Sequence, residues 1–280
     1  MKTIELLHPQ TKQQLELSAQ HPAHAYLLIG PRGAAKQMAA EWLAGQLLGL
    51  KDKSASQPNL ILLRCESGKK SITIAQVKEV VARLSITSYD QKHPKVVIAS
   101  HIENLTVEAG NALLKALEEP PSDTVFVLTT SQIGAVLPTI ISRTQLVWFM
   151  KPAAEQLKQT LHKDYQANLV EQARLLAEGQ PARTLRLLQD PGVLGQKQAT
   201  LSRAEEFLGG TLTQRFLVAK QVHAGENVVE FIDGLIYILR TKFSILDTAS
   251  NLKNIMKAQE NLQHNLNSRL VLENLSLELA

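Results

Sequence analysis

The segment GPRGAAKQ, which begins at Gly30, approximates the phosphate-binding loop G-x-x-x-x-G-K followed by Ser or Thr. In a working loop, backbone amides cradle the phosphates, the lysine contacts the terminal phosphates and the hydroxyl binds Mg²⁺. Gly30 and Lys36 fall in register and Gly33 lies between them, but Ala35 replaces the second glycine and Gln37 replaces the hydroxyl residue. Taken alone, the segment is equally compatible with a plain strand-to-helix turn.

A second part of the same chemistry is expected two strands later in the chain. A P-loop ATPase carries there an Asp that holds Mg²⁺ and a Glu that activates water. The corresponding apolar run, KVVIA, is followed by Ser100 and His101, and Glu103 lies two residues further into the turn. Neither Ser100 nor His101 does those jobs. The sequence therefore predicts a degenerate nucleotide site that does not hydrolyse ATP.

Other reactive side chains show no catalytic spacing. Glu118 and Glu119 are adjacent, so on a helix they would point about 100° apart, and we interpret them as solvated carboxylates. Arg143, between Ser142 and Thr144, is by itself typical of a surface charge. The histidines form no H-E-x-x-H motif and no G-x-S-x-G elbow is present, so metal hydrolases and serine hydrolases have no support.

Composition narrows the class of protein. The 280 residues are 44% hydrophobic and 20% charged, an ordinary globular balance, with no apolar run long enough for a membrane span. The N-terminus lacks the apolar core of a signal peptide, and the single cysteine, Cys65, supports neither disulfides nor a cysteine-based zinc site. We expect a cytoplasmic protein without a metal of its own. The net charge of +4 permits contact with nucleic acid without demanding it, because the basic residues are dispersed.

Five short apolar runs must position the candidate residues. They occupy residues 25–30, 59–65, 95–100, 124–130 and 145–149. Such runs are typical of strands covered on both faces, and helical patterns separate the first four, so the sequence predicts an α/β domain with a parallel sheet. Its ligands would bind at the carboxyl ends of the strands, where GPRGAAKQ lies.

From Lys151 onward only helical patterns occur. Predicted helices cover residues 153–165, 168–179, 181–190, 228–246 and 267–279, with a loop around residues 190–195. The expected organisation is an α/β core domain at 1–150, a small helical lid at 151–192 and a C-terminal helical domain at 193–280.

Four strings together resemble the clamp-loader branch of the AAA+ proteins. They are HAYLLIGPRG (24–33), KVVIASHIENLT (95–106), AGNALLKALEEPP (109–121) and LPTIISRTQ (137–145). The resemblance implies an AAA+ P-loop-type core, a lid and a C-terminal collar that assemble into a ring. It implies ATPase subunits of the gamma or tau type and a delta subunit as partners, and the beta sliding clamp and primer-template DNA through the complex.

The resemblance also assigns residue roles. Arg143 looks like an arginine finger, with Ser142 and Thr144 beside it, that reaches the ATP of a neighbouring subunit, and Thr130 matches a sensor position. Thr144 replaces the usual cysteine, Ala182 stands where a second sensor arginine is usual, and the four-cysteine zinc module of many relatives is absent.

We therefore expect a non-hydrolysing ring member with no cofactor of its own, ATP being bound by its partners. One alternative is a gamma- or tau-type clamp-loader ATPase with an unusual P-loop. Another is a free-standing adaptor derived from AAA+ proteins that joins no ring and needs no arginine finger.

Overall fold

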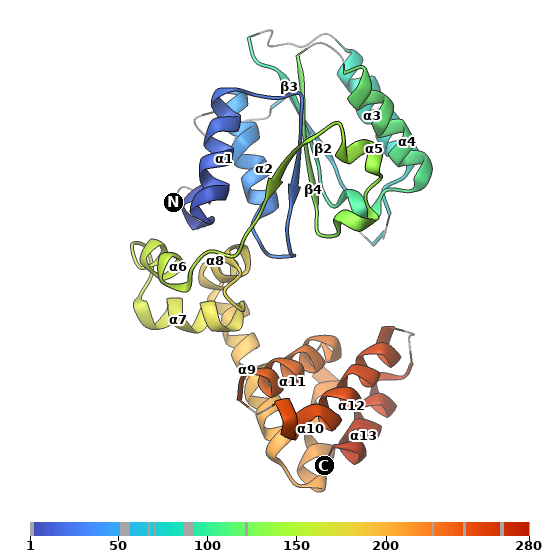
Figure 1. The fold of residues 1–280 in the computed structure, drawn as a ribbon. Helices are drawn as coiled ribbons and strands as arrows, with labels where there is room; N and C mark the ends of the chain where they lie inside the picture. The colour runs from blue at the N-terminus through green and yellow to red at the C-terminus, as the bar shows by residue number, and fades with distance from the viewer. Residues whose placement is uncertain are drawn as a thin grey trace. The chain divides into compact units, whose positions relative to one another are not determined.

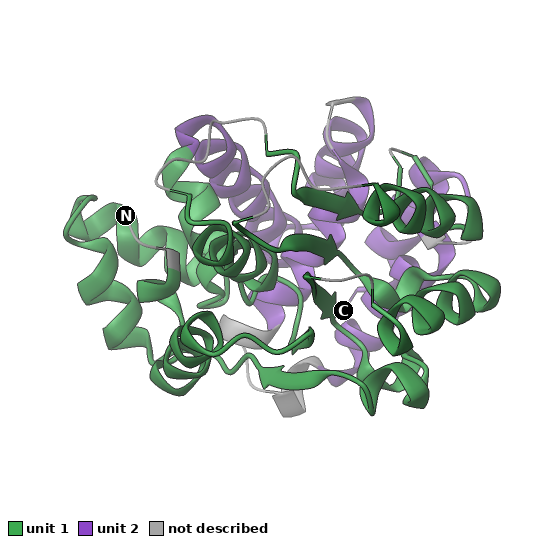
Figure 2. Cartoon of the chain, turned by 90° about the horizontal axis from the view of Figure 1, so that it is seen from above, with its two compact units in different colours: residues 1–189 green, residues 190–280 purple. Residues whose placement is uncertain are grey.

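The computed structural model describes residues 3–50, 57–66, 68–69, 71–86, 92–120, 123–225, 227–242, 245–263 and 266–279. The chain divides into two compact units, Met1–Gln189 and Asp190–Ala280 (Figure 2). The lid was expected at 151–192, and its residues up to Gln189 group with the first unit.

The first unit contains a sheet of five parallel strands. They are β1 (Ala25–Ile29), β2 (Leu60–Leu63), β3 (Lys95–Ala99), β4 (Thr124–Thr130) and β5 (Gln145–Trp148). Their spatial order is β2-β3-β4-β1-β5, and each strand lies within one of the five apolar runs. The predicted α/β fold with a parallel sheet is confirmed.

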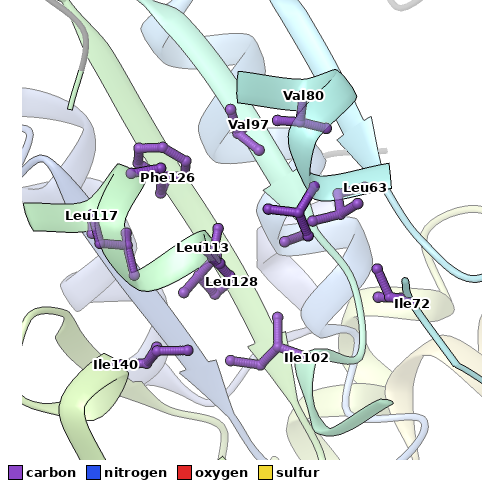
Figure 3. Packing of buried hydrophobic residues seen from close by; sticks show 14 of the residues in the cluster. Leu63, Ile72, Val80, Val97, Ile102, Leu113, Leu117, Phe126, Leu128 and Ile140 are labelled. Atoms are coloured by element: carbon purple, nitrogen blue, oxygen red, sulfur yellow. The ribbon is translucent and has the colours of Figure 1, made fainter. Parts of the chain in front are cut away.

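Helices cover both faces of this sheet (Figure 1). One face carries α1 (Pro9–Gln20) and α2 (Lys36–Leu47), and the other carries α3 (Ile74–Ser85) and α4 (Val107–Glu118). Since successive strand residues point to opposite faces, Phe126 and Leu128 of β4 pack with Leu113 and Leu117 of α4, as Figure 3 shows. Val127 packs into the layer on the opposite face.

Local signals set the bounds of the helices around the site. Thr73 and Gln76 form a capping box at the start of α3, and the Thr106 hydroxyl accepts from the backbone N–H of Ala109 at the start of α4. α4 ends at Glu118, just before Pro120, because a proline disfavours helical backbone in the residue before it. Short turns η1 (Thr3–Leu6), η2 (Ile102–Asn104) and η3 (Ile133–Ala135) and the four-residue helix α5 (Pro138–Ile141) complete the core.

The three helices predicted after residue 150 are present in the first unit. They are α6 (Ala154–Leu161), α7 (Ala167–Leu176) and α8 (Pro181–Gln189). Gly179, with a φ of +68°, follows α7, and Pro181 occupies the first position of α8, where its missing N–H is not needed.

The second unit is entirely helical within its described residues. It consists of α9 (Pro191–Gly209), α10 (Leu212–Gly225), α11 (Val228–Lys242), α12 (Ile245–Gln263) and α13 (Ser268–Glu278). Its core includes Phe207 of α9 and Phe231 of α11, whose rings meet edge to face with centroids 5.5 Å apart. In the described residues of both units, no helix is long and apolar enough to cross a membrane.

Two expectations for this unit are wrong. The loop expected around residues 190–195 is the first turn of α9, because the Asp190 side chain accepts from the backbone N–H of Val193 and Pro191 takes the first helical position. The helix expected over 228–246 is divided, since α11 ends at Lys242 and α12 begins at Ile245.

Candidate functional site: a P-loop-like turn and an exposed arginine

The GPRGAAKQ loop lies at the carboxyl edge of the sheet, between β1 and α2, and borders a cavity of about 380 Å³. The cavity brings together six of the residues selected from the sequence: Gly33, Ala35, Lys36, Gln37, His101 and Ala182. Arg32, Met38, Asn104 and Thr129 complete its lining. The loop thus follows the first strand directly, as the sequence predicted.

Lys36 is turned into its own loop. Its Nζ donates to the carbonyl oxygens of Gly30 (2.6 Å) and Pro31 (2.8 Å), and lies 3.4 Å from Ser131 Oγ. The residue is only 5% exposed. Burial lowers the pKa of Lys36 to about 8, with the charge of Glu103 opposing this shift and that of Arg32 adding to it. The loop carbonyls thus take the hydrogen bonds that a phosphate would take in a working loop.

Ala35 precedes α2 in a left-handed backbone conformation, with a φ of 68° and a ψ of 21°. Glycine adopts this conformation without steric penalty, whereas a residue with a Cβ is strained in it. The loop therefore has a glycine-type backbone at the position where the phosphate-binding motif carries glycine and this chain carries alanine.

Gln37 occupies the position of the hydroxyl residue that would bind Mg²⁺. Its Oε1 accepts a hydrogen bond of 2.6 Å from Ser100 Oγ, and its Nε2 donates to Glu41 Oε1 at 3.1 Å. Ser100 follows β3, where a P-loop ATPase carries its metal-binding carboxylate. A hydrogen bond between two neutral side chains thus links the two metal-binding positions.

His101 and Glu103 form a polar cluster beside this link. His101 has a φ of 56°, its Nδ1 lies 3.2 Å from Glu103 Oε1, and its backbone N–H donates to Thr129 Oγ1. Burial alone would raise the pKa of Glu103, but hydrogen bonds from its own backbone, Thr130, His101 and Ser131 together lower it below its ordinary value. Glu103 therefore stays ionised close to Lys36.

Sequence reasoning did not assign Glu103 to the site. The signal that could have identified it is that it is the first carboxylate after β3, in a turn that must run along the cavity edge. The sensor-like residue Thr130 is fully buried, and its Oγ1 accepts from the backbone N–H of Gln132. Its neighbour Thr129, rather than Thr130, lines the cavity.

The lid contacts the loop directly. The backbone N–H of Ala182 in α8 donates to the Gly33 carbonyl at 3.2 Å. A Cβ on Gly33 would lie 2.0 Å from Gln180 Oε1 and 3.1 Å from Arg183 Cδ. Ala182, which the resemblance aligns with a second sensor arginine, therefore contacts the loop through its backbone and has no cationic side chain. Gln180 is a further residue at the site that sequence reasoning missed.

Arg143 lies away from this cavity, in the turn that follows α5. Its Nη2 forms an ion pair of 2.8 Å with Glu118 Oε1 at the end of α4, and its Nη1 donates to the Thr139 carbonyl at 3.2 Å. Nη1 also lies 3.4 Å from Ser142 Oγ, while Thr144 Oγ1 donates to the Ile141 carbonyl. The Arg143 side chain is 38% exposed, so its guanidinium is accessible from outside the chain.

At the two positions where a P-loop ATPase binds Mg²⁺, this chain carries the amide of Gln37 and the hydroxyl of Ser100, and neither is a carboxylate. Gln37 and Ser100 satisfy each other, and Lys36 is held by its own loop. Throughout the described ranges, no group of three or more His, Cys, Asp or Glu side chains is arranged to hold a metal ion.

The parallel sheet, the loop after its first strand and the helical lid on that loop define an AAA+-type module. The sequence model of the family described as "DNA polymerase III, delta subunit" matches residues 7–153, and the chain belongs to this family.

Curated relatives give the same family. The chain is 34% identical over 213 residues to DNA polymerase III subunit delta' of Pseudomonas aeruginosa, covering 70% of this chain and 64% of that protein. It is 34% identical to the Bacillus subtilis delta' subunit, covering 55% of this chain and 50% of the relative. DNA polymerase III subunit tau of Bacillus subtilis is 29% identical, covering 50% of this chain and 27% of the relative. The chain thus spans between half and two thirds of the length of these two delta' relatives.

A solved structure supports the fold over nearly the whole chain. A DNA polymerase III gamma subunit-related protein from Thermotoga maritima matches with a TM-score of 0.65, covering 96% of this chain and 97% of that one. The two sequences are 21% identical, so this likeness is one of fold.

Proposed function

We propose that the chain is a non-hydrolysing, delta-prime-type subunit of the DNA polymerase III clamp loader in the cytoplasm. In this role it is a ring member that helps load the sliding clamp onto primed DNA. It holds no cofactor of its own, and Arg143 acts as an arginine finger on the ATP of a neighbouring subunit.

The hydrogen bond between Gln37 and Ser100 is the observation that carries the proposal. Phosphoryl transfer in P-loop enzymes depends on a metal ion held by a hydroxyl in the loop and a carboxylate after β3. Here the first position is an amide, the second is a hydroxyl, and the two groups are 2.6 Å apart. Ala182 also stands where a second sensor arginine is usual, so three parts of the nucleotide site depart together from those of a working ATPase.

Arg143 supports a role in a complex. It is an accessible guanidinium on a short turn, anchored by a neighbouring helix rather than facing this chain's own cavity. A guanidinium presents rigid donors that suit phosphate oxygens, and an arginine supplied by a neighbour can accelerate hydrolysis by about 10³–10⁵-fold in related NTPases. The partners we propose are gamma or tau ATPase subunits and a delta subunit, with the beta clamp and primer-template DNA bound through the complex.

The alternative is a gamma- or tau-type ATPase with an unusual P-loop. Its support is that a tau subunit is among the relatives of the chain and that Glu103 places a carboxylate near Lys36. The proposal predicts no Mg²⁺-dependent ATP hydrolysis by the isolated chain. Turnover that disappears in Lys36→Ala would favour the alternative.

The finger is tested in a loader reconstituted from the full chain and its partners. Arg143→Ala should fold and assemble but lower the DNA-stimulated ATPase rate severalfold. Arg83→Ala, which removes an exposed arginine from α3, is the matched control and should leave the rate unchanged. An unchanged rate for Arg143→Ala at saturating assembly would contradict the finger. Failure to co-purify with the ATPase subunits would favour a free-standing adaptor.

A further inference from the structure

Glu118 holds the guanidinium of Arg143 in one orientation. The ion pair between Arg143 Nη2 and Glu118 Oε1 is 2.8 Å long, and Nη1 is held on the other side by the Thr139 carbonyl and near Ser142 Oγ. The arginine is thus fixed by α4 as well as by its own turn. Glu118 belongs to a different element of the fold, 25 positions earlier in the chain.

The turn that carries Arg143 is attached to α4 at both of its ends. At its start, Leu137 packs so closely on Gly110 that a Cβ there would lie 2.9 Å from Leu137 Cδ1. At its end, Arg143 pairs with Glu118. Gly110 and Glu118 are eight residues apart, a little over two helical turns, so the two contacts hold the segment at two levels along α4. The helix therefore serves as a rigid support for the whole segment from Leu137 to Arg143.

The position of Glu118 at the end of α4 makes its pairing with a cation favourable. Glu118 is the last residue of α4, where the partial negative charge of the helix end disfavours a carboxylate. The Arg143 cation offsets that unfavourable placement. Because both side chains are well exposed, at 38% and 41%, the pair adds little to the stability of the fold. Its larger effect is on the freedom of the arginine, which is a long and otherwise mobile side chain.

We infer that Glu118 is a positioning residue for Arg143, an inference that rests on the proposed finger function. A guanidinium carries five N–H donors in a planar fork, and Glu118, Thr139 and Ser142 engage the donors on Nη1 and one on Nη2. The donors that remain can bind oxygens of a neighbouring subunit's triphosphate while Glu118 keeps the plane of the fork fixed. Such preorientation lowers the barrier without requiring a new contact to substrate.

The test uses the reconstituted loader with Glu118→Ala and Glu118→Gln. We expect Glu118→Ala to lower kcat for DNA-stimulated ATP hydrolysis about three- to tenfold with KM for ATP nearly unchanged, since the arginine is present but less ordered. Glu118→Gln keeps an acceptor and should lie between wild type and Glu118→Ala. Glu119→Ala removes the neighbouring exposed carboxylate and serves as the matched control with unchanged kcat.

A double variant separates positioning from a general structural role. If Glu118 acts through the arginine, Glu118→Ala combined with Arg143→Ala should be no slower than Arg143→Ala alone. Additive losses in the double variant, or a kcat for Glu118→Ala equal to or above wild type, would overturn the inference. If the Arg143→Ala loader is slow in the same experiment, the proposed arginine finger is still supported. An Arg143→Ala loader with normal turnover would instead overturn the proposed function and this inference together.

Discussion

Ser100 Oγ donates a hydrogen bond of 2.6 Å to Gln37 Oε1, and so ties the end of β3 to the start of α2. P-loop ATPases hold a metal ion between these two positions. The protein therefore places a neutral, direct contact where such enzymes place a charged ligand. Because of this contact, restoring the phosphate-binding motif in the loop alone would not restore a metal site.

Restoring the loop motif alone should not create an ATPase. The double change Ala35→Gly and Gln37→Thr completes the G-x-x-x-x-G-K-T pattern but leaves Ser100 and His101 without a metal carboxylate or a base. We expect no Mg²⁺-dependent phosphate release above that of the wild-type chain. Measurable turnover would show that another carboxylate, with Glu103 the nearest candidate, performs these roles.

Ala35→Gly by itself should stabilise the first unit. The left-handed conformation destabilises a residue with a Cβ by about 1–2 kcal/mol, and glycine removes this strain. Glycine also gives the unfolded chain more conformational freedom, which offsets about 0.4–1 kcal/mol of the stabilisation. We expect the free energy of unfolding to rise by about 0.5–1 kcal/mol in denaturant titrations. Ala82→Gly, at an exposed position of α3, should instead lower it by about 1 kcal/mol. Equal losses in both variants would contradict strain at Ala35.

Lys36 should make stability depend on pH in the alkaline range. Its pKa is about 8 in the folded protein and 10.5 ordinarily, so between these values the unfolded chain binds the additional proton. Stability from this group therefore rises with pH across that window, with a slope approaching about 1.4 kcal/mol per pH unit.

The measurement compares unfolding free energies from pH 7 to 10.5 for wild type and Lys36→Met. The wild-type slope should be the more positive, and Lys163→Met, at an exposed lysine, should keep the wild-type slope. Identical slopes for wild type and Lys36→Met would rule out the lowered pKa.

Arg215 should stabilise the second unit by joining two helix ends. Its guanidinium donates to the carbonyls of Phe207 and Leu208 in α9, and to that of Leu279 just after α13. These carbonyls have few partners within their own helices. Arg215→Ala should lower the free energy of unfolding of this unit by about 1–3 kcal/mol.

The comparison for Arg215→Ala is Lys220→Ala, which removes an exposed charge from the same helix. It should change the free energy of unfolding by less than about 0.5 kcal/mol. A loss in Lys220→Ala as large as that in Arg215→Ala would point to net charge rather than to the carbonyl contacts.

The sequence predicted the sheet well because both faces of its strands are buried, which produces runs such as TVFVLTT that contain almost no solvent-facing positions. Helix α1 was not predicted, because its residues PQTKQQLELSAQ are mostly polar and bury only Thr11, Leu15 and Ser18. The start of α9 was also missed, because Asp190 and Pro191 are turn formers as well as helix starters.

Within the site, the spacing of Gly30 and Lys36 identified the loop, since those signals are local. The contacts that define its state are not local. Gln37 and Ser100 are 63 positions apart, and the lid residue Gln180 meets Gly33 only in the folded chain. Likewise, the sequence alone led us to interpret Glu118 as a solvated carboxylate, whereas in the folded chain Arg143, in the turn after α5, forms an ion pair with it.

The glycines Gly30 and Gly33 have structural reasons that do not depend on a bound phosphate. A side chain at Gly30 would collide with Phe149 just after β5, and one at Gly33 would collide with Gln180 before α8. Gly30 is therefore required by the adjacent backbone and Cβ of Phe149, and Gly33 is favoured by its φ of +83°, with or without a phosphate. The presence of these two glycines therefore reflects the packing and backbone of the loop and does not by itself indicate phosphate binding. Whether the loop binds a nucleotide has to be read from Gln37 and Ser100.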